Sequence, residues 1–141
     1  MSTGTRSLIA TLHRALTALD AGLVLLFDDL GDGLHPRLTA ELVRLFTSPL
    51  SNPNGAQLVF TSHDATLLSD GSTGGVLTSD QVWLTEKTSS GATELYPLSA
   101  AQPQPEEDLG RSYRSGAFGA VPQLTEGQMA RRLLRCQTLG S

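Results

Sequence analysis

The sequence predicts an α/β fold in which a parallel sheet is flanked by helices and an antiparallel hairpin follows. Two short apolar runs, residues 23–28 and 56–61, read as strands, and amphipathic stretches at 5–20 and 36–47 read as helices. Two strands joined through a helix form a parallel pair with a right-handed crossover. The third observation is a later pair of strand-like segments within 81–98, which predicts a hairpin that extends or covers that sheet.

The two predicted helices each carry an apolar stripe at helical spacing. Gly22 ends the first helix, and Pro36 suits the first turn of the second. The stripes predict which side chains face the core: Leu8, Leu12, Ala15, Leu16 and Leu19 in the first helix, and Leu38, Leu42, Leu45 and Phe46 in the second.

The predicted strands are unbroken apolar runs that end in polar chemistry. Leu23-Val-Leu-Leu-Phe27 runs into the acidic pair Asp28-Asp29, and Gln57-Leu-Val-Phe60 runs into Thr61-Ser-His-Asp64. Continuous apolarity is typical of strands that are buried on both faces, as in parallel sheets. Residues 48–55, rich in Pro, Asn and Gly, predict the loop between the second helix and the second strand.

The chain divides into a folded lobe at residues 1–98 and a linker with a tail at residues 99–141. The hairpin strands are expected at 81–87 and 93–98. Residues 102–108 are linker-like, and a short C-terminal helix is expected at 125–136. Its three arginines are more typical of a solvated face than of a DNA contact.

The length, charge and cysteine content of the chain argue against several classes of protein. A length of 141 residues predicts a single domain, and a content of 39% hydrophobic residues argues against a chain that is disordered throughout. A net charge of -4 argues against binding to nucleic acid or acidic lipid that is mainly electrostatic. A membrane partner is therefore not expected, whereas nucleic-acid binding through a local basic patch stays open. One cysteine allows no intrachain disulfide, and no apolar run approaches a membrane span, so we expect a cytoplasmic protein.

The strongest candidate site is the edge where both strands deliver polar groups. Ligands of open α/β sheets collect outside the carboxyl ends of the strands. Asp28 and Asp29 with Thr61, Ser62 and His63 suit magnesium and phosphate chemistry, because a carboxylate can hold the water shell of the metal, a second can activate water, and an imidazole can bond a phosphate oxygen. The alternative is that the acidic pair only caps the following loop and His63 caps a helix.

A second candidate is the opening of the first helix, Ser2-Thr-Gly-Thr5. Helix N-termini present free N–H groups and the positive end of the dipole, which suit an anion. Most such stretches are simple caps, so this pattern alone does not decide between a phosphate contact and a cap. His35 before Pro36 is likewise more typical of a structural cap than of a ligand.

Taken together, these motifs resemble a known family. The order Ser2-Thr-Gly-Thr5, Leu25-Leu-Phe-Asp-Asp29, Leu34-His-Pro36 and Val59-Phe-Thr-Ser-His63 is similar to the C-terminal half of an ABC-type ATPase. The similar proteins are the AAA-type group that includes RecF-, SMC- and OLD-like proteins, and especially bacterial AAA-family ATPases of the abortive-infection kind, which serve phage defence. The resemblance continues through Asp80-Gln-Val-Trp-Leu-Thr-Glu-Lys87 and Thr93-Glu-Leu-Tyr-Pro-Leu98 to residue 122.

The resemblance implies a partial P-loop NTPase-type sheet, ATP and Mg²⁺ as cofactors, and a role for each motif. Ser2 and Gly4 match the signature motif, which contacts the γ-phosphate of a nucleotide that a second subunit binds. Asp28 matches the Walker B aspartate that supports Mg²⁺, and Asp29 stands at the position of the catalytic glutamate. Gly31-Asp-Gly-Leu34 matches the D-loop, and His63 matches the switch histidine that senses the γ-phosphate.

The sequence also departs from the family. A P-loop needs Gly-x-x-x-x-Gly-Lys, and the single lysine, Lys87, follows Thr85-Glu86. The chain therefore resembles the C-terminal portion of a longer protein, from a truncated or split gene or a misplaced start. Asp29 is one methylene shorter than the usual glutamate, Gly33 replaces a common D-loop serine, and Ala117 stands where related sequences tend to carry arginine.

Three functions are open at this point. In the first, the chain completes an ATP site as a homodimer or with a P-loop-bearing partner chain, and by itself it is an inactive ATPase. In the second, it is a non-enzymatic remnant or regulatory lobe that binds the surface of a partner ATPase. A toxin- or nuclease-like protein is a further candidate partner. In the third and weakest, it is a magnesium-dependent phosphoacceptor that uses Asp28, Asp29, Thr61 or Ser62, and Lys87.

Overall fold

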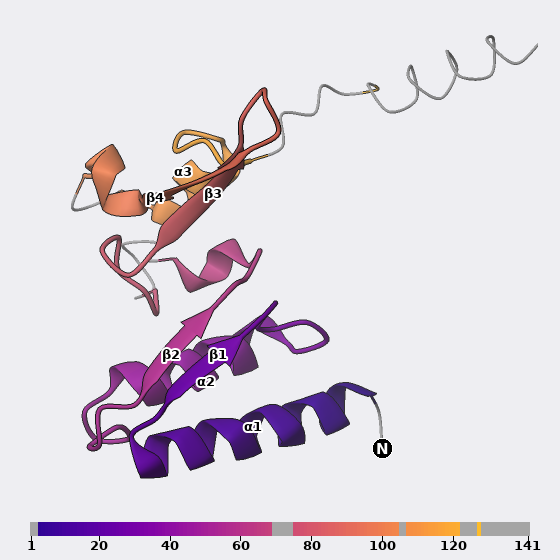
Figure 1. Cartoon of the computed structure of the whole chain (residues 1–141), viewed down its shortest axis with the longest axis vertical. Coiled ribbons are helices and arrows are strands. Elements are labelled where there is room, and N and C mark those ends of the chain that lie inside the picture. Colours follow the sequence, from indigo (N-terminus) through magenta and orange to yellow (C-terminus); the bar gives the residue numbers. More distant parts are fainter. Residues whose placement is uncertain (1–2, 69–74, 105–106, 122–126, 128–141) are drawn as a thin grey trace, which may run out of the picture.

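The computed structural model describes residues 3–68, 75–104, 107–121 and 127. It has the predicted mixed α/β architecture, with two helices around a parallel pair of strands and an antiparallel hairpin after them (Figure 1). The expected C-terminal helix at 125–136 lies outside the described residues, apart from residue 127. The elements are α1 (Thr3–Ala21), β1 (Val24–Phe27), α2 (Pro36–Thr47), β2 (Gln57–Phe60), η1 (Ala65–Leu67), β3 (Trp83–Lys87), β4 (Thr93–Pro97), η2 (Leu98–Ala101) and α3 (Leu109–Arg114).

Strands β1 and β2 form the predicted parallel pair. Val24 lies opposite Gln57 and Phe27 lies opposite Phe60, so the two strands are in register over their whole length. Each observed strand is one residue shorter at both ends than the strand predicted at 23–28 or 56–61. Because the strands are parallel and in register, the polar residues that follow them emerge side by side.

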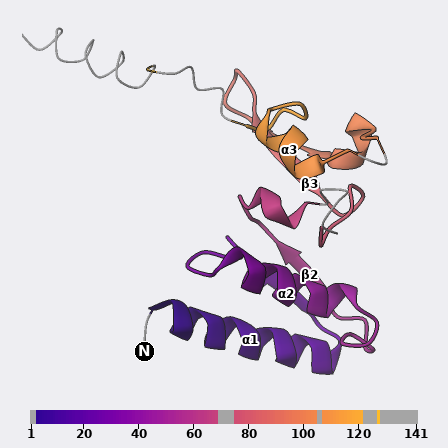
Figure 2. The ribbon, with the colours of Figure 1, turned by 180° about the vertical axis from the view of Figure 1, so that it is seen from behind.

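Only one face of this sheet is covered by the described residues. Leu25 and Phe27 of β1, with their partners Leu58 and Phe60 of β2, pack against a cluster formed with α1 and α2. Helix α2 lies behind the strands in Figure 1 and in front of them in Figure 2. The prediction of burial on both faces is wrong for this sheet, because the remaining apolar strand residues are 55–73% exposed: Val24, Leu26 and Val59.

The buried stripes of the helices also differ from the prediction. Leu16 of α1 is 58% exposed and Leu38 of α2 is 43% exposed, although both were expected in the core. The buried side chains of α1 include the small residues Ala15 and Ala18, which allow the helix to pack closely beside β1 and α2. Both stripes are therefore rotated toward small or β-branched residues, which include Thr11 in α1 and Thr39 and Val43 in α2.

The loop between α2 and β2 is held by two asparagine side chains. The Asn54 amide donates to the carbonyls of Leu19 (3.2 Å) and Asp20 (2.8 Å), so it caps the C-terminus of α1 across the sequence. The Asn52 amide donates to the carbonyls of Phe46 and Ala56, at 2.9 and 2.8 Å. The predicted loop is thus tied by side-chain hydrogen bonds to the end of α1, to α2 and to the residue before β2.

The hairpin formed by β3 and β4 is confirmed, but it does not extend the parallel sheet. Its two strands pair only with each other among the described elements, and it packs on a second apolar cluster. The prediction that it extends or covers the parallel sheet is wrong. Leu84 of β3 packs in a cluster with Leu68, which follows η1, and with Leu109 of α3, while the outer face of β1–β2 stays exposed. The buried members of that cluster are Leu68, Leu84, Leu98 and Leu109.

Three short elements were not predicted, and one of them is the 3-10 helix η2 that follows the hairpin. The 3-10 helix η1 is capped by Asp64, whose carboxylate accepts the Thr66 N–H at 2.9 Å. Helix α3 follows the segment that the sequence marks as a linker, and Asp108 caps it in the same way through the Arg111 N–H. Within the described ranges, no helix is both long and apolar enough to cross a membrane.

Candidate functional site

Backbone pairing continues beyond the strands and brings the predicted site residues together. The Thr61 N–H donates to the Phe27 carbonyl at 3.1 Å, and the Leu30 N–H donates to the Thr61 carbonyl at 2.8 Å. These two bonds hold Asp28 and Asp29 directly beside Thr61. The acidic pair and the polar end of β2 therefore share one edge of the sheet, as the parallel arrangement requires.

The hydroxyl of Thr61 joins the two acidic residues. It donates to Asp28 Oδ1 at 2.7 Å, and it accepts the Asp29 N–H at 2.7 Å. A hydroxyl can act as donor and acceptor at the same time, and here both capacities are used on neighbouring residues. One side chain thus fixes the carboxylate of Asp28 and the peptide group that carries Asp29.

Asp29 has a left-handed backbone with φ of 53°. Aspartate and asparagine occupy this region more readily than most residues that carry a Cβ atom. The turn directs the Asp29 carboxylate toward the other strand end, where Oδ1 lies 3.2 Å from His63 Nδ1. His63 and Asp29 side chains are 84% and 54% exposed, so this pair adds little to stability and stays accessible to a ligand.

The segment that carries His63 is anchored by its neighbours. The Ser62 hydroxyl donates to the Leu30 carbonyl and accepts the Asp64 N–H, both at 3.2 Å. Asp64 in turn caps η1. These bonds place His63 at a fixed point between β2 and η1. A proton on Nδ1, directed to Asp29, leaves Nε2 as the ring atom for a second contact.

The start of α1 lies against the loop that follows the acidic pair. A Cβ atom on Gly4 would be 3.0 Å from the Gly33 carbonyl oxygen, so glycine permits this approach. The structure thus brings the candidate signature residue Gly4 beside the candidate D-loop, whereas Ser2 lies outside the described residues. His35 is the cap of α2, because its Nδ1 accepts the Arg37 N–H at 3.2 Å, which confirms the structural interpretation of that residue.

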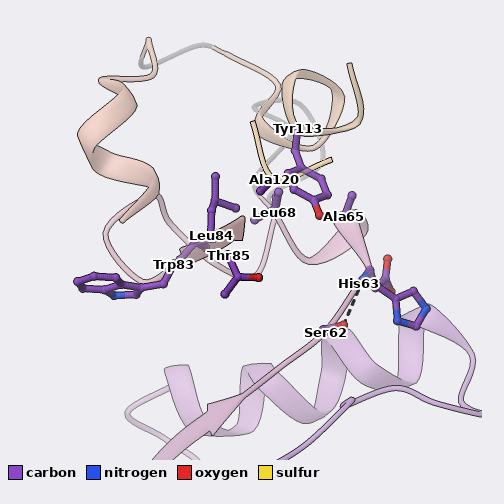
Figure 3. A pocket seen from close by; sticks show the side chains of 11 residues that line it. Ser62, His63, Ala65, Leu68, Trp83, Leu84, Thr85, Tyr113 and Ala120 are labelled. Atoms are coloured by element: carbon purple, nitrogen blue, oxygen red, sulfur yellow. Dashed lines mark hydrogen bonds between the residues drawn. The ribbon is translucent and has the colours of Figure 1, made fainter. Parts of the chain in front are cut away.

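A small cavity borders His63 on the side of the hairpin (Figure 3). Its volume is about 120 Å³, and its lining includes Ser62, His63, Trp83 and Tyr113. In Figure 3 the ring of His63 and the indole of Trp83 lie at opposite sides of this cavity. A separate depression over the exposed sheet face is continuous with the acidic edge, since its lining includes Leu26, Asp28, Val59 and Thr61.

The donor set at the edge suits Mg²⁺ only in part. Carboxylate oxygens are preferred magnesium ligands, but the described residues contain no group of three His, Cys, Asp or Glu side chains that could hold a metal ion. Magnesium is commonly held by one or two carboxylates with waters and substrate phosphates completing its shell. The Asp28 carboxylate fits that role, in which a bound phosphate and waters would supply the remaining ligands.

Lys87 is not part of this edge. Its ammonium donates to Thr93 Oγ1 at 2.7 Å, at the end of the hairpin that adjoins the turn. The phosphoacceptor hypothesis required Lys87 beside the acidic pair, and the structure does not bring them together. The role of Thr61 as the bridge was missed, although a hydroxyl at a strand end opposite an acidic pair is a signal for it.

Residues 1–69 match a protein family described as "AAA domain, putative AbiEii toxin, Type IV TA system". The matched region is slightly less than half of the 141 residues and contains both strands of the parallel sheet and all of the candidate site. The match supports an AAA-type, ATPase-like family for this part of the chain. No curated protein and no solved structure matches the sequence.

Proposed function

We propose that the chain contributes one part of a composite ATP site, the part that carries Walker B, signature and switch residues. The observation that carries the proposal is the convergence of Asp28, Asp29 and His63 at the ends of two parallel strands, inside the region that matches an AAA-type family. The close approach of Gly4 to the Gly33 carbonyl places the start of α1 beside the loop that follows Asp28 and Asp29.

Each residue has a distinct role in this proposal. The Asp28 carboxylate supports Mg²⁺, which, when bound, neutralises charge on the nucleotide phosphates. Asp29 orients and deprotonates the attacking water, and His63 presents Nε2 to the γ-phosphate while Nδ1 stays on Asp29. Gly4 offers its backbone N–H at the start of α1 to the γ-phosphate of a nucleotide held by another chain. The family resemblance assigns Ser2 to the same contact.

In this proposal the nucleotide is held mainly by a P-loop on a partner lobe. The described edge offers carboxylates, which repel a triphosphate unless a metal ion bridges them. The exposed apolar face of β1–β2 is continuous with that edge, so a partner lobe that covers Leu26 and Val59 would also bring its phosphate-binding loop to Asp28. The exposed face is thus the contact surface for this lobe.

Complementation of ATP hydrolysis tests the proposal. The full chain is mixed with the P-loop-bearing lobe of an AAA-type ATPase, and phosphate release is compared with that of either component alone. We expect hydrolysis only in the mixture, and its loss with Asp28→Asn or His63→Ala. Asp20→Asn, an exposed aspartate at the end of α1, is the matched control. A mixture that is no faster than the lobe alone, or an Asp28→Asn variant as active as the wild type, would contradict the proposal.

A non-enzymatic regulatory lobe is the second candidate. Asp29 in place of a glutamate, and an exposed apolar face ready for a partner, favour it. The same mixture distinguishes the two functions, because a regulatory lobe binds the partner and changes its basal hydrolysis without any dependence on Asp28 or His63.

A further inference from the structure

We infer that Thr61 is the positioning residue of this site, and that it acts through the two aspartates rather than on the nucleotide. The inference rests on the proposed function, since it assigns to Thr61 the task of preparing Asp28 for the metal and Asp29 for the water. The Thr61 hydroxyl is the group that contacts both members of the acidic pair.

Thr61 makes four hydrogen bonds to the end of β1. Its N–H and carbonyl pair with Phe27 and Leu30, and its hydroxyl pairs with Asp28 Oδ1 and the Asp29 N–H. The backbone bonds survive any substitution except proline, whereas the hydroxyl bonds require serine or threonine. The two sets can therefore be separated by experiment: removal of the hydroxyl tests the side chain alone.

The hydroxyl has two consequences for the acidic pair. Because Asp28 Oδ1 is engaged by Thr61, the other carboxylate oxygen is the one left to face a metal ion, and the carboxylate cannot rotate freely. Because the Asp29 N–H is held, the peptide is kept in the turn with φ of 53° that directs its carboxylate to His63. Loss of the hydroxyl releases both groups at once.

Because Thr61 is exposed, removal of its hydroxyl should affect the orientation of Asp28 more than the stability of the fold. Its side chain is exposed, so its hydroxyl bonds compete with water and contribute little to folding. The orientation of Asp28 depends on the hydroxyl directly, and partners that orient a metal-binding carboxylate typically change metal affinity by about 10–100-fold. A large loss of metal affinity with an unchanged melting temperature is the signature of a positioning residue.

The experiment uses Mn²⁺ alone as the probe and follows paramagnetic broadening of the backbone amides of residues 27–29 in the full chain. We expect Thr61→Val to weaken Mn²⁺ binding by about 10-fold or more, Thr61→Ser to retain it, and Asp28→Asn to abolish it. Hydrogen exchange at the Asp29 amide should accelerate in the valine variant only. The matched control is Thr66→Val, which removes a hydroxyl-to-carboxylate bond of the same 2.7 Å length, on Asp64.

Each outcome decides the inference. If Asp28→Asn abolishes Mn²⁺ binding but Thr61→Val does not weaken it, Thr61 is not a positioning residue, and the proposed function stands. If Asp28→Asn leaves Mn²⁺ binding unchanged, the proposed metal role fails and the inference fails with it. Thr61→Ala supplies the same loss of the hydroxyl if the valine variant does not fold, and rescue by serine is required in either case.

Discussion

At the scale of single residues, the candidate site depends on one uncommon backbone conformation. The left-handed region costs most residues with a Cβ atom about 1–2 kcal/mol, and aspartate is among those that tolerate it best. Asp29 adopts this conformation with φ of 53°, and its carboxylate reaches His63 only because of that turn. An aspartate therefore suits the local backbone at position 29.

Asp29→Asn should separate catalysis from folding. Asparagine keeps the shape of the side chain and tolerates the left-handed conformation, so the free energy of unfolding should change by less than about 0.5 kcal/mol. It cannot accept a proton, so hydrolysis in the mixture with the P-loop lobe should fall by about 100-fold or more. Thermal unfolding and phosphate release measure the two effects, and an equally active asparagine variant would remove Asp29 from the role of base.

Asp29→Glu should raise the turnover and lower the stability. The added methylene extends the carboxylate by about 1.5 Å, and a misplacement of about 1 Å can cost on the order of 100-fold in rate, so turnover in the mixture should rise. Glutamate lacks the tolerance of aspartate for the left-handed region, so unfolding should become easier by about 0.5–1 kcal/mol. Unchanged or lower turnover in the glutamate variant would count against the assignment of Asp29.

At the scale of the elements, glycines and asparagines in the connections decide where the helices end. Gly22 follows α1 with φ of 63°, and a Cβ atom there would lie 2.7 Å from the Asn54 carbonyl oxygen. Gly33 has a similar φ of 71°, but no heavy atom lies within 4 Å of its Cβ position. The two glycines therefore share a backbone requirement and differ in their surroundings.

Alanine at these two positions should have unequal effects. Gly33→Ala should lower the free energy of unfolding by about 1 kcal/mol, because only the left-handed backbone resists it. Gly22→Ala should cost about 2 kcal/mol or more, because the new methyl also meets the Asn54 carbonyl. Urea unfolding of the two variants measures the difference. Equal losses of unfolding free energy would show that the loop around Asn54 moves to accommodate the methyl group without an energetic cost.

The sequence was sufficient to predict the helices and strands of residues 3–60, but not which of their faces are covered. Helix 36–47 and the parallel strands were predicted because apolar periodicity and the run of Leu23 to Phe27 are local signals. The exposure of Leu26 and Leu16 could not be predicted, because local apolarity does not say whether a neighbour covers a given face. The separate position of the hairpin and the bridge made by Thr61 likewise depend on contacts between distant segments.

At the scale of the whole molecule, the segment that follows α3 is tied to the hairpin through Tyr96. The Tyr96 hydroxyl donates to the Phe118 carbonyl at 2.8 Å, and Gly119 lies against both this hydroxyl and the Glu86 carboxylate. Burial, and next to it the negative charge of Glu86, raise the pKa of Tyr96 above its ordinary value of 10.0. The neutral hydroxyl is thus the form that the folded chain favours.

Stability should therefore fall in alkali in a way that depends on Tyr96. A raised pKa in the folded state means that the contribution is complete below the ordinary tyrosine pKa of 10.0 and is lost as the pH rises through the folded value. Between about pH 8 and pH 11 the wild type should lose more stability than Tyr96→Phe. Urea unfolding of the two proteins at both pH values tests this. Equal losses would rule out the tyrosine as the cause.

The exposed sheet face gives a second prediction at this scale. Leu26 is 73% exposed, so Leu26→Lys should leave the melting temperature nearly unchanged, yet it should weaken complementation with the P-loop lobe by about 10-fold or more, because a charge would be buried in the contact. Leu50→Lys, at a loop residue that is 96% exposed, is the matched control. Retained complementation in the Leu26 variant would place the partner elsewhere.

Calorimetric titration of Mg-ATP tests the central claim, a composite nucleotide site, most directly. Micromolar binding requires about 8 kcal/mol, and the described edge offers carboxylates without a phosphate-binding loop, so the chain alone should give no measurable isotherm. In the mixture with the P-loop lobe, Mg-ATP should bind more tightly than to that lobe alone, and Asp28→Asn should remove the gain. A one-to-one isotherm in the low micromolar range for the chain alone would contradict the account, because the chain would then hold a nucleotide site of its own.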